Sequence, residues 1–392
     1  MSSCGTEDEY FELKEKDQIP IRLLSAVKIS KLSITNISSL VYSSGLGFPV
    51  SQMKYNVQIW EITYETIYKG SNIIASGRAF IPLGNREEFS YLTFAHGTIV
   101  ANKDAPSELS IANIETFVYA AMASTGLITV VPDFIGFGSS KEIMHPYYVE
   151  ETSALAVIDG LRAVRELMNQ EEIRSDAELY LSGFSEGGYV SMATHKYIEE
   201  KGLEYFNLKA SFPACGGYDM KGVRDFFFDQ HIYERPYFMA YIAESYRSYY
   251  DIDTSWASQI FNEPYSKRVI NIFDGISDGS QINSKLNDTV AVLIAANFLS
   301  NPENKKFSKI SDLFEQNSLL DWIPNIPVYL FHGDADITIP YQNSVDTYDA
   351  FLALGGSPET ITLTAFEGAD HYTAVIPYLE NFLNIIIELE GY

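Results

Sequence analysis

The sequence contains little cysteine and no long apolar run. Its two cysteines, Cys4 and Cys215, fall in a polar N-terminal stretch and at the end of a predicted buried strand, so we expect no disulfide between them. The spacing Cys-x-x-Cys is absent, which excludes the common structural zinc sites, and we predict no bound metal. No run of about 18 apolar residues occurs, so we predict no integral membrane span.

Positive charge is also scarce. The chain has 27 Lys and Arg residues against 52 Asp and Glu residues, which gives a formal net charge of −25. Such a surface repels the phosphates of nucleic acid and the headgroups of anionic membranes. We therefore expect neither nucleic acid nor an anionic membrane surface as a partner.

Two interpretations fit the first residues of the chain. The opening Met1-Ser2-Ser3-Cys4-Gly5, followed by acidic residues, resembles the mature end of a bacterial lipoprotein in which Cys4 carries the lipid. The alternative is a polar, disordered N-terminus. No signal-peptide pattern is recognised in the sequence as printed. The first interpretation predicts an extracytoplasmic protein with a lipid anchor at Cys4, and the second leaves a cytoplasmic protein open.

The pattern of apolar residues predicts an α/β fold. Hydrophobic residues make up 46% of the 392 positions, which suits one large domain with an insertion or two domains. Two β-rich stretches, 57–64 and 73–81, flank a turn and predict an antiparallel hairpin. Strand and helix patterns then alternate, which predicts a mostly parallel sheet. The continuous apolar run 126–131 is typical of a strand covered on both faces.

The same pattern divides the chain into segments. Residues 1–56 read as an N-terminal tail and a leading helical segment, because apolar positions between 21 and 40 have spacing compatible with helices. Residues 57–216 and 325–392 are the predicted core. Residues 217–324 are aromatic and mainly helical in pattern, and about a hundred residues are too many for a loop. We predict a helical cap or lid, whose aromatic side chains favour a substrate with apolar or ring-containing parts.

The strongest motif is Gly183-Phe184-Ser185-Glu186-Gly187. An apolar strand pattern precedes it and a helical pattern follows, which is the context of a nucleophile elbow. The tight turn requires small flanking residues, here Gly183 and Gly187. The following helix offers backbone N–H groups and a positive dipole end to developing negative charge. Ser185 is therefore the predicted nucleophile.

A serine hydroxyl needs a base within hydrogen-bond reach. In folds with such an elbow the chain order is Ser, then Asp or Glu, then His. Among the six histidines, only His371 follows both Ser185 and another acid placed just after a predicted strand. We predict His371 as the base and Asp336 as the acid that orients it, with Asp334 as the competing acid.

A tetrahedral intermediate also needs donors for its oxyanion. We expect the N–H groups of Glu186 and of Thr98, which follows a predicted strand in His96-Gly97-Thr98. The sequence leaves open whether the side chains of Glu186 and Glu150 are structural or face substrate. The glycine-rich loop 133–140 is expected to form a wall of the catalytic pocket. It lacks the Gly-Lys-Ser/Thr signature of a nucleotide site, and we predict no organic cofactor.

Taken together, these motifs resemble the α/β-hydrolase superfamily of serine esterases and lipases, and within it they are similar to the secretory lipases. The resemblance covers about residues 57–392 and implies a mostly parallel sheet flanked by helices with an inserted helical cap. It implies hydrolysis of a small-molecule carboxylic ester through an acyl-enzyme. Gly-x-Ser-x-Gly-Gly also occurs in serine peptidases of the same fold, which is the alternative function. The matching pieces are His96-Gly97-Thr98, Asp133-x-x-Gly136-x-Gly138, His145-Pro146-Tyr147, Gly183 to Gly188, His332-Gly333-x-x-Asp336 and His371.

Overall fold

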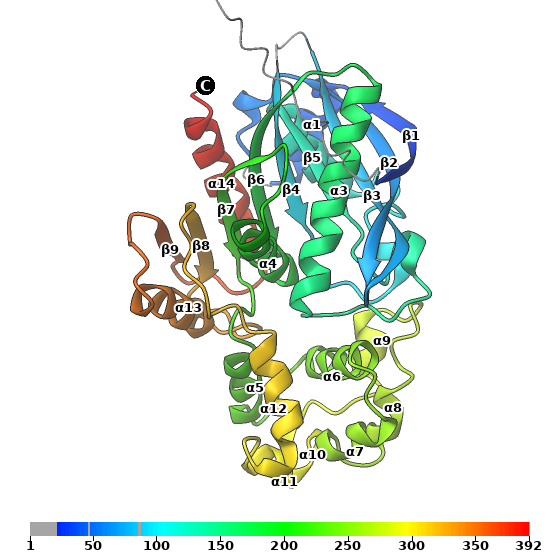
Figure 1. Cartoon of the computed structure of the whole chain (residues 1–392), viewed down its shortest axis with the longest axis vertical. Coiled ribbons are helices and arrows are strands. Elements are labelled where there is room, and N and C mark those ends of the chain that lie inside the picture. Colours follow the sequence, from blue (N-terminus) through cyan, green and yellow to red (C-terminus); the bar gives the residue numbers. More distant parts are fainter. Residues whose placement is uncertain (1–21, 46–47, 85–87, 392) are drawn as a thin grey trace, which may run out of the picture.

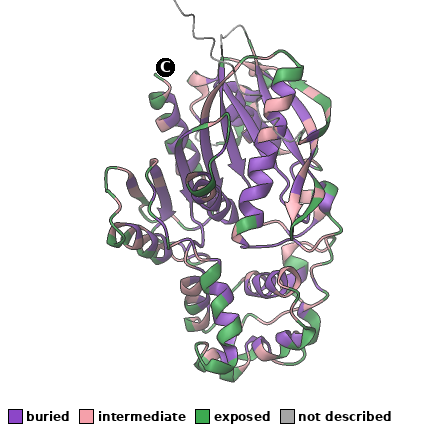
Figure 2. Ribbon diagram, viewed as in Figure 1, coloured by how far each residue is buried: buried purple, intermediate pink, exposed green. Residues whose placement is uncertain are grey.

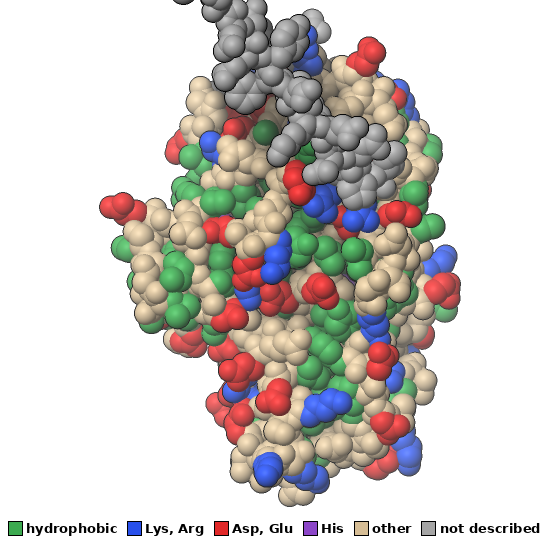
Figure 3. Space-filling model, viewed as in Figure 1, with side chains coloured by type: hydrophobic (Ala, Val, Ile, Leu, Met, Phe, Trp, Pro, Cys, Tyr) green, Lys and Arg blue, Asp and Glu red, His purple; other side chains and the backbone are tan. Residues whose placement is uncertain are grey.

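The computed structural model of the chain describes residues 22–45, 48–84 and 88–391. The predictions made for the start of the chain, including a lipid anchor at Cys4, lie outside these residues. Among the described residues, no helix combines the length and the apolar character needed to cross a membrane. On the face shown in Figure 3, acidic side chains are spread over the surface with Lys and Arg side chains between them.

A single sheet runs through the upper part of the molecule in Figure 1. Within the described residues it has nine strands in the order β1-β2-β3-β5-β4-β6-β7-β8-β9. The pairs from β5 through β4, β6, β7 and β8 to β9 are all parallel, which confirms the predicted mostly parallel sheet. The strands are β1 Leu23–Leu32, β2 Asn56–Tyr68, β3 Ser71–Leu83, β4 Phe89–Ala95, β5 Leu127–Pro132, β6 Ser175–Phe184, β7 Asn207–Ala214, β8 Val328–Gly333 and β9 Ile361–Phe366.

The predicted hairpin forms the antiparallel side of the sheet. β2 and β3 pair in unbroken register from Tyr68 opposite Ser71 to Asn56 opposite Leu83. β3 then pairs antiparallel with β5, and this joins the hairpin to the parallel strands. β5 is buried along its whole length, as expected for a strand covered on both faces.

The leading segment differs from its predicted helical structure. Residues 23–32 form the edge strand β1, which pairs antiparallel with β2, and only Ile34–Ser44 form a helix, α1. The apolar side chains that suggested a helix do not share a buried face, because Leu24 is 48% exposed and Val27 is 54% exposed. The backbone N–H and C=O groups along the edge of β2 need hydrogen-bond partners, and β1 supplies them. This pairing decides the structure of residues 23–32 against the helix-compatible spacing of their apolar residues.

Helices cover both faces of the sheet (Figure 1). One face carries α1, α2 (Ile114–Ser124) and α14 (Val375–Leu389), whose apolar residues share a core cluster with β4, β6 and β7. The other face carries α3 (Glu150–Gln170) and α4 (Glu186–Lys201). Helix α13 (Tyr341–Ala353) packs on β8 and β9 at the edge of the sheet. Buried residues fill the space between these layers (Figure 2).

A helical segment, residues 217–324, joins β7 to β8 and lies beyond one end of the sheet (Figure 1). Its aromatic side chains share a core cluster with Tyr147 and Tyr148, which lie just before α3. The Tyr147 ring stacks on Tyr241 of α6 with centroids 4.5 Å apart, and the Tyr246 hydroxyl donates to the carbonyl oxygen of Tyr148. The helices are α5 Met220–Asp229, α6 Tyr237–Tyr249, α7 Ala257–Ile260, α8 Tyr265–Val269, α9 Gly279–Asn283, α10 Val290–Leu293, α11 Ala296–Ser300 and α12 Ser308–Gln316.

Candidate active site

Ser185 occupies a sharp turn between β6 and α4. Its backbone has φ +59° and ψ −122°, a conformation that costs a non-glycine residue about 1–3 kcal/mol. A Cβ atom added to Gly183 would overlap the carbonyl oxygen of Gly187, and one added to Gly187 would overlap that of Ala95. Only glycine fits these two positions, as the tight turn predicted. The turn holds the Ser185 side chain at the end of the parallel strand.

The structure brings Ser185, His371 and Asp336 together from three separate parts of the chain. Nε2 of His371 lies 2.9 Å from the Ser185 hydroxyl oxygen, and Nδ1 lies 2.6 Å from Oδ2 of Asp336. Asp336 follows β8, and His371 lies in the loop between β9 and α14. All three residues are less than 10% exposed. With Nδ1–H donated to the carboxylate, Nε2 is left with a lone pair that can accept the serine proton.

The Asp336 carboxylate is held in its ionised form. Burial raises its pKa, but hydrogen bonds from His332 and His371 outweigh burial and hold the pKa at about 2. Its other oxygen accepts from the backbone N–H groups of Thr338 and Ile339, at 2.8 and 3.0 Å. These bonds fix the carboxylate in one orientation against His371.

The other acids near this loop face elsewhere. Asp334, the competing candidate, is exposed and accepts a hydrogen bond of 2.7 Å from the N–H of Gly368. Asp370 is also exposed and accepts from the N–H groups of Tyr372 and Thr373. The structure therefore brings Asp336, and neither of these acids, into contact with His371.

The two predicted oxyanion donors flank Ser185. Glu186 is the first residue of α4, so its N–H has no acceptor within the helix. The loop carrying Thr98 lies against Ser185, because a Cβ atom added to Gly97 would lie 3.7 Å from Cβ of Ser185. The Thr98 hydroxyl is tied to the Tyr147 hydroxyl at 2.8 Å. This arrangement places both residues beside the serine.

The sequence left open whether the side chains of Glu186 and Glu150 are structural or face substrate. In the structure both side chains contact other residues of the protein. Glu186 is 2% exposed, and its Oε1 lies 2.6 Å from Nε2 of His145. Glu150 starts α3 and pairs with Lys196 at 3.1 Å. The contact between His145 and Glu186 was not predicted, because no spacing rule links residues 41 positions apart. The only sequence signal was an acid directly after the nucleophile and a histidine after a glycine-rich loop.

A cavity of about 480 Å³ opens over Ser185 and His371. Its apolar wall includes Phe94, Val118 and Leu379, and the helical segment contributes Tyr237 and Phe238. The charged side chains on the lining are Glu115 and Arg235, and the Arg235 guanidinium lies over the Tyr372 ring at 4.6 Å. The lining as a whole suits a substrate with apolar or aromatic parts.

The glycine-rich loop 133–140 does not line this cavity, so its predicted role as a pocket wall is wrong. It lies behind the loop that carries Thr98: the Phe134 ring stacks on His96 with centroids 4.1 Å apart. The Asp133 carboxylate accepts from the hydroxyls of Ser76 and Ser107, both at 2.6 Å. The loop acts as a buried support because Asp133 ties it to β3 and to residue 107.

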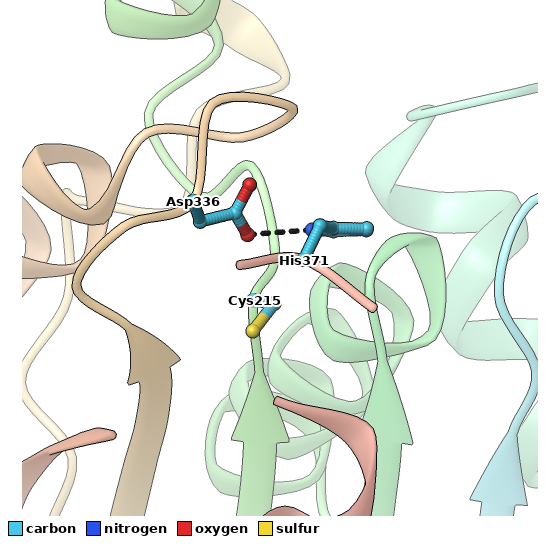
Figure 4. Close-up of side chains that lie close together, drawn as sticks. All are labelled: Cys215, Asp336 and His371. Carbon is cyan, nitrogen blue, oxygen red and sulfur yellow. Dashed lines mark hydrogen bonds and ion pairs between the residues drawn. The ribbon is translucent and has the colours of Figure 1, made fainter. Parts of the chain in front are cut away.

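Cys215 lies next to Asp336 and His371 (Figure 4). Each of the three residues has one atom that could bind a metal ion, and these three atoms lie within 4.8 Å of one another. Nδ1 of His371 and Oδ2 of Asp336 are already engaged with each other, at 2.6 Å. Burial, and then the charge of Asp336, raises the pKa of the Cys215 thiol, which opposes the thiolate form that a metal requires. The absence of a metal stays a prediction.

Cys215 will not react with thiol reagents in the folded protein. Cys215 is fully buried and its raised pKa keeps it protonated at neutral pH, so it does not react as a nucleophile. Peptide mass spectrometry after treatment with iodoacetamide measures this, with the urea-unfolded protein as the control in which Cys215 is alkylated. Alkylation of Cys215 in the folded protein would contradict the prediction.

Comparisons with known proteins find lipases among the relatives of this chain. A family model described as "Secretory lipase" matches residues 103–200. Lipase 5 of Candida albicans is 24% identical over 282 residues, which cover 68% of this chain and 55% of the relative. Lipase 4 of the same organism is 24% identical over 267 residues, covering 62% of this chain and 51% of the relative. The chain thus spans about half the length of these curated relatives.

Solved structures show the same fold. The rice cell wall degrading esterase LipA from Xanthomonas oryzae superimposes with a TM-score of 0.80 at 24% identity, covering 93% of this chain and 97% of that one. Candida antarctica lipase A in its closed state gives a TM-score of 0.65 at 16% identity, covering 90% and 78%. The chain therefore has the α/β-hydrolase fold and is related to lipases and esterases. Within that class, its predicted resemblance to the secretory lipases is confirmed.

Proposed function

We propose that the protein is a serine hydrolase that cleaves carboxylic esters through an acyl-enzyme. Ser185 is the nucleophile, His371 the general base and acid, and Asp336 the carboxylate that orients His371. The observation that carries the proposal is the continuous hydrogen-bonded chain from Ser185 through His371 to Asp336, with bonds of 2.9 and 2.6 Å. The relationship to lipases and esterases supports an ester as the substrate.

The reaction proceeds in two halves. The Ser185 oxygen attacks the ester carbonyl carbon while Nε2 of His371 takes the serine proton. The N–H groups of Glu186 and Thr98 stabilise the oxyanion, and Asp336 stabilises the imidazolium. Collapse of the intermediate breaks the bond to the alcohol, which leaves with the proton from His371. Water then attacks the acyl-enzyme by the same route and releases the carboxylic acid and free Ser185.

The helical segment is proposed to act as a cap on the substrate cavity. Arg235, Tyr237 and Phe238 belong to it and line the same cavity as Ser185. Tyr237 and Phe238 add aromatic rings to the cavity lining, which suits an ester with an aromatic or aliphatic group. A cap built this way also limits the access of water to the acyl-enzyme.

The enzyme will prefer short to medium acyl chains. Its cavity of about 480 Å³ is in the lower half of the range of roughly 300–1,000 Å³ for ligand sites, so we expect the far end of an extended long acyl chain to lie outside it unless the helical segment moves. The measurement is kcat/KM for p-nitrophenyl esters from acetate to palmitate. Each buried CH₂ that fits is worth ~0.8 kcal/mol, so we expect kcat/KM to rise from acetate to a maximum at or before octanoate. At palmitate we expect a fall of about tenfold or more, because the additional carbons are not buried in the cavity.

Two controls complete this measurement. Ser185→Ala reports background hydrolysis, and aminoacyl-p-nitroanilides test the alternative of a peptidase. A maximum at palmitate would show that the helical segment opens into a lipid-sized tunnel. Turnover of the anilides with negligible turnover of every ester would overturn the proposed function in favour of the peptidase.

We further propose that the enzyme acts outside the cytoplasm. The relationship to secretory lipases supports this location. Fractionation of cells that express the natural gene, followed by immunodetection in cytoplasmic, membrane and external fractions, tests it. Confinement to the cytoplasmic fraction would contradict it.

A further inference from the structure

The side chains of Glu186 and His145 form a buried acid–base pair next to Ser185, and neither side chain takes part in the reaction as proposed. Glu186 is 2% exposed and His145 is 6% exposed. Nε2 of His145 lies 2.6 Å from Oε1 of Glu186, and Nδ1 lies 2.6 Å from the carbonyl oxygen of Ile135. The second carboxyl oxygen of Glu186, Oε2, is buried and has no hydrogen-bond partner among the described residues.

The hydrogen bonds fix how many protons the pair holds. The Ile135 carbonyl can only accept, so Nδ1 of His145 carries a proton and donates it. The 2.6 Å contact between Nε2 and Oε1 then requires one more proton between them. That proton makes either an imidazolium with a carboxylate or a neutral imidazole with a carboxylic acid. The net charge of the pair is zero in both forms.

No other cation can replace His145 in this role. Among the described residues, no Lys or Arg forms an ion pair with Glu186. The ring of His145 is enclosed by aromatic side chains, including Phe137 at 5.0 Å and Tyr241 at 5.7 Å between centroids. A carboxylate in such surroundings is costly unless it is paired. Without His145 the Glu186 carboxyl group, which lies beside the reacting serine, loses the partner that balances its charge.

The groups around the pair come from several elements. Burial raises the pKa of Tyr147, Tyr148 and Tyr241, with the charge of Glu186 among the further causes, so these hydroxyls stay neutral at physiological pH. Burial raises the pKa of Tyr237 in the same way. On the far side of His145, a cavity of about 240 Å³ is bordered by the charged residues Lys141, Glu142, Glu244 and Asp274, of which Glu244 is paired with Arg247.

We infer that His145 is a positioning residue for the oxyanion site, which acts by holding the Glu186 side chain and cancelling its negative charge. This inference rests on the proposed function. Glu186 offers its backbone N–H to the oxyanion, so an unpaired charge on its own side chain would oppose the charge that develops in the transition state. The bond to His145 removes that opposition and fixes the first turn of α4 behind Ser185.

His145→Phe and the double variant His145→Phe with Glu186→Gln test this inference, with kcat and KM for p-nitrophenyl butyrate as the readout. His145→Phe fits the aromatic enclosure but leaves the Glu186 charge unpaired. We expect kcat to fall roughly 10- to 100-fold with little change in KM, which is less than the ~10²–10³-fold cost of removing an oxyanion donor outright. Adding Glu186→Gln to His145→Phe removes the charge, and kcat should recover at least fivefold relative to His145→Phe alone.

A matched control separates this effect from loss of packing. His195 is fully buried on the same helix as Glu186 and contacts Glu199 at 2.9 Å, ten residues from the nucleophile. His195→Phe should lower the Tm and leave kcat within about twofold, because its pair lies away from the oxyanion. If His145→Phe does not fold, His145→Gln, whose amide can donate to Ile135, replaces it and is judged in the same way.

The activities of the two His145 variants and of the wild-type protein decide the inference. A double variant that is no more active than His145→Phe would overturn it, because the charge of Glu186 would then not be the cause. Wild-type kcat in His145→Phe would overturn it as well. Absence of ester turnover in the wild-type protein would reject the proposed function together with the inference. Wild-type turnover with an unaffected His145→Phe would reject the inference alone.

Discussion

Replacing Ser185 with alanine will abolish ester turnover and lower kcat by about 10⁶-fold, the cost seen when the nucleophile of a serine hydrolase triad is removed. The variant loses the oxygen that lies 2.9 Å from His371 and keeps every other contact of the turn. Any remaining catalysis would come from the N–H groups of Glu186 and Thr98 acting on water. The measurement is single-turnover and steady-state hydrolysis of p-nitrophenyl butyrate.

A control measurement must show that Ser185→Ala still folds. Alanine keeps the Cβ atom of Ser185, so circular dichroism and Tm should match those of the wild-type protein. Labelling by a fluorophosphonate should be lost in Ser185→Ala and present in the wild-type protein. Turnover within tenfold of the wild type in a folded Ser185→Ala would exclude Ser185 as the nucleophile, whatever the geometry around it.

Replacing Asp336 with asparagine will lower kcat by roughly 10³–10⁴-fold. Asp336 accepts the Nδ1 proton of His371 and is ionised because its pKa lies at about 2. An amide NH₂ group in its place favours the tautomer of His371 that carries the proton on Nε2. That proton faces Ser185, so the imidazole can no longer act as a base.

Asp334→Asn is the matched control for this change, because it makes the same chemical substitution two residues away. Asp334 is exposed and contacts the N–H of Gly368 rather than His371. Its substitution should change kcat by less than threefold, as expected for a surface side chain outside the reacting network. A large loss in Asp334→Asn with near-normal activity in Asp336→Asn would reverse the assignment of the acid.

The parts of the fold that the sequence predicted are those set by strong local patterns. β-branched and aromatic runs predicted the hairpin and the parallel strands, because these patterns match the period and burial of strands. The site residues Ser185, Asp336 and His371 followed from motif order, since the carboxyl ends of neighbouring parallel strands meet at one edge. The structure brings these residues into hydrogen-bond contact.

The differences arise where the deciding contact is distant in sequence. β1 pairs with β2 although its apolar spacing was compatible with a helix, because the open edge of β2 supplied partners that no local pattern encodes. The loop 133–140 lies behind the cavity because the Asp133 carboxylate is held by Ser76 and Ser107. His145 and Glu186 are joined across 41 positions, a contact that only the assembled fold brings about.

The left-handed backbone of Ser185 has a consequence for how this chain can evolve. At this φ of +59°, glycine would be the relaxed residue, so the fold would gain stability by giving up its proposed nucleophile. The two flanking glycines lower the cost of the turn but do not remove the strain on the serine between them. Stability and the proposed reactivity are therefore opposed at this one position, and the rest of the fold must offset the strain that the proposed role places on Ser185.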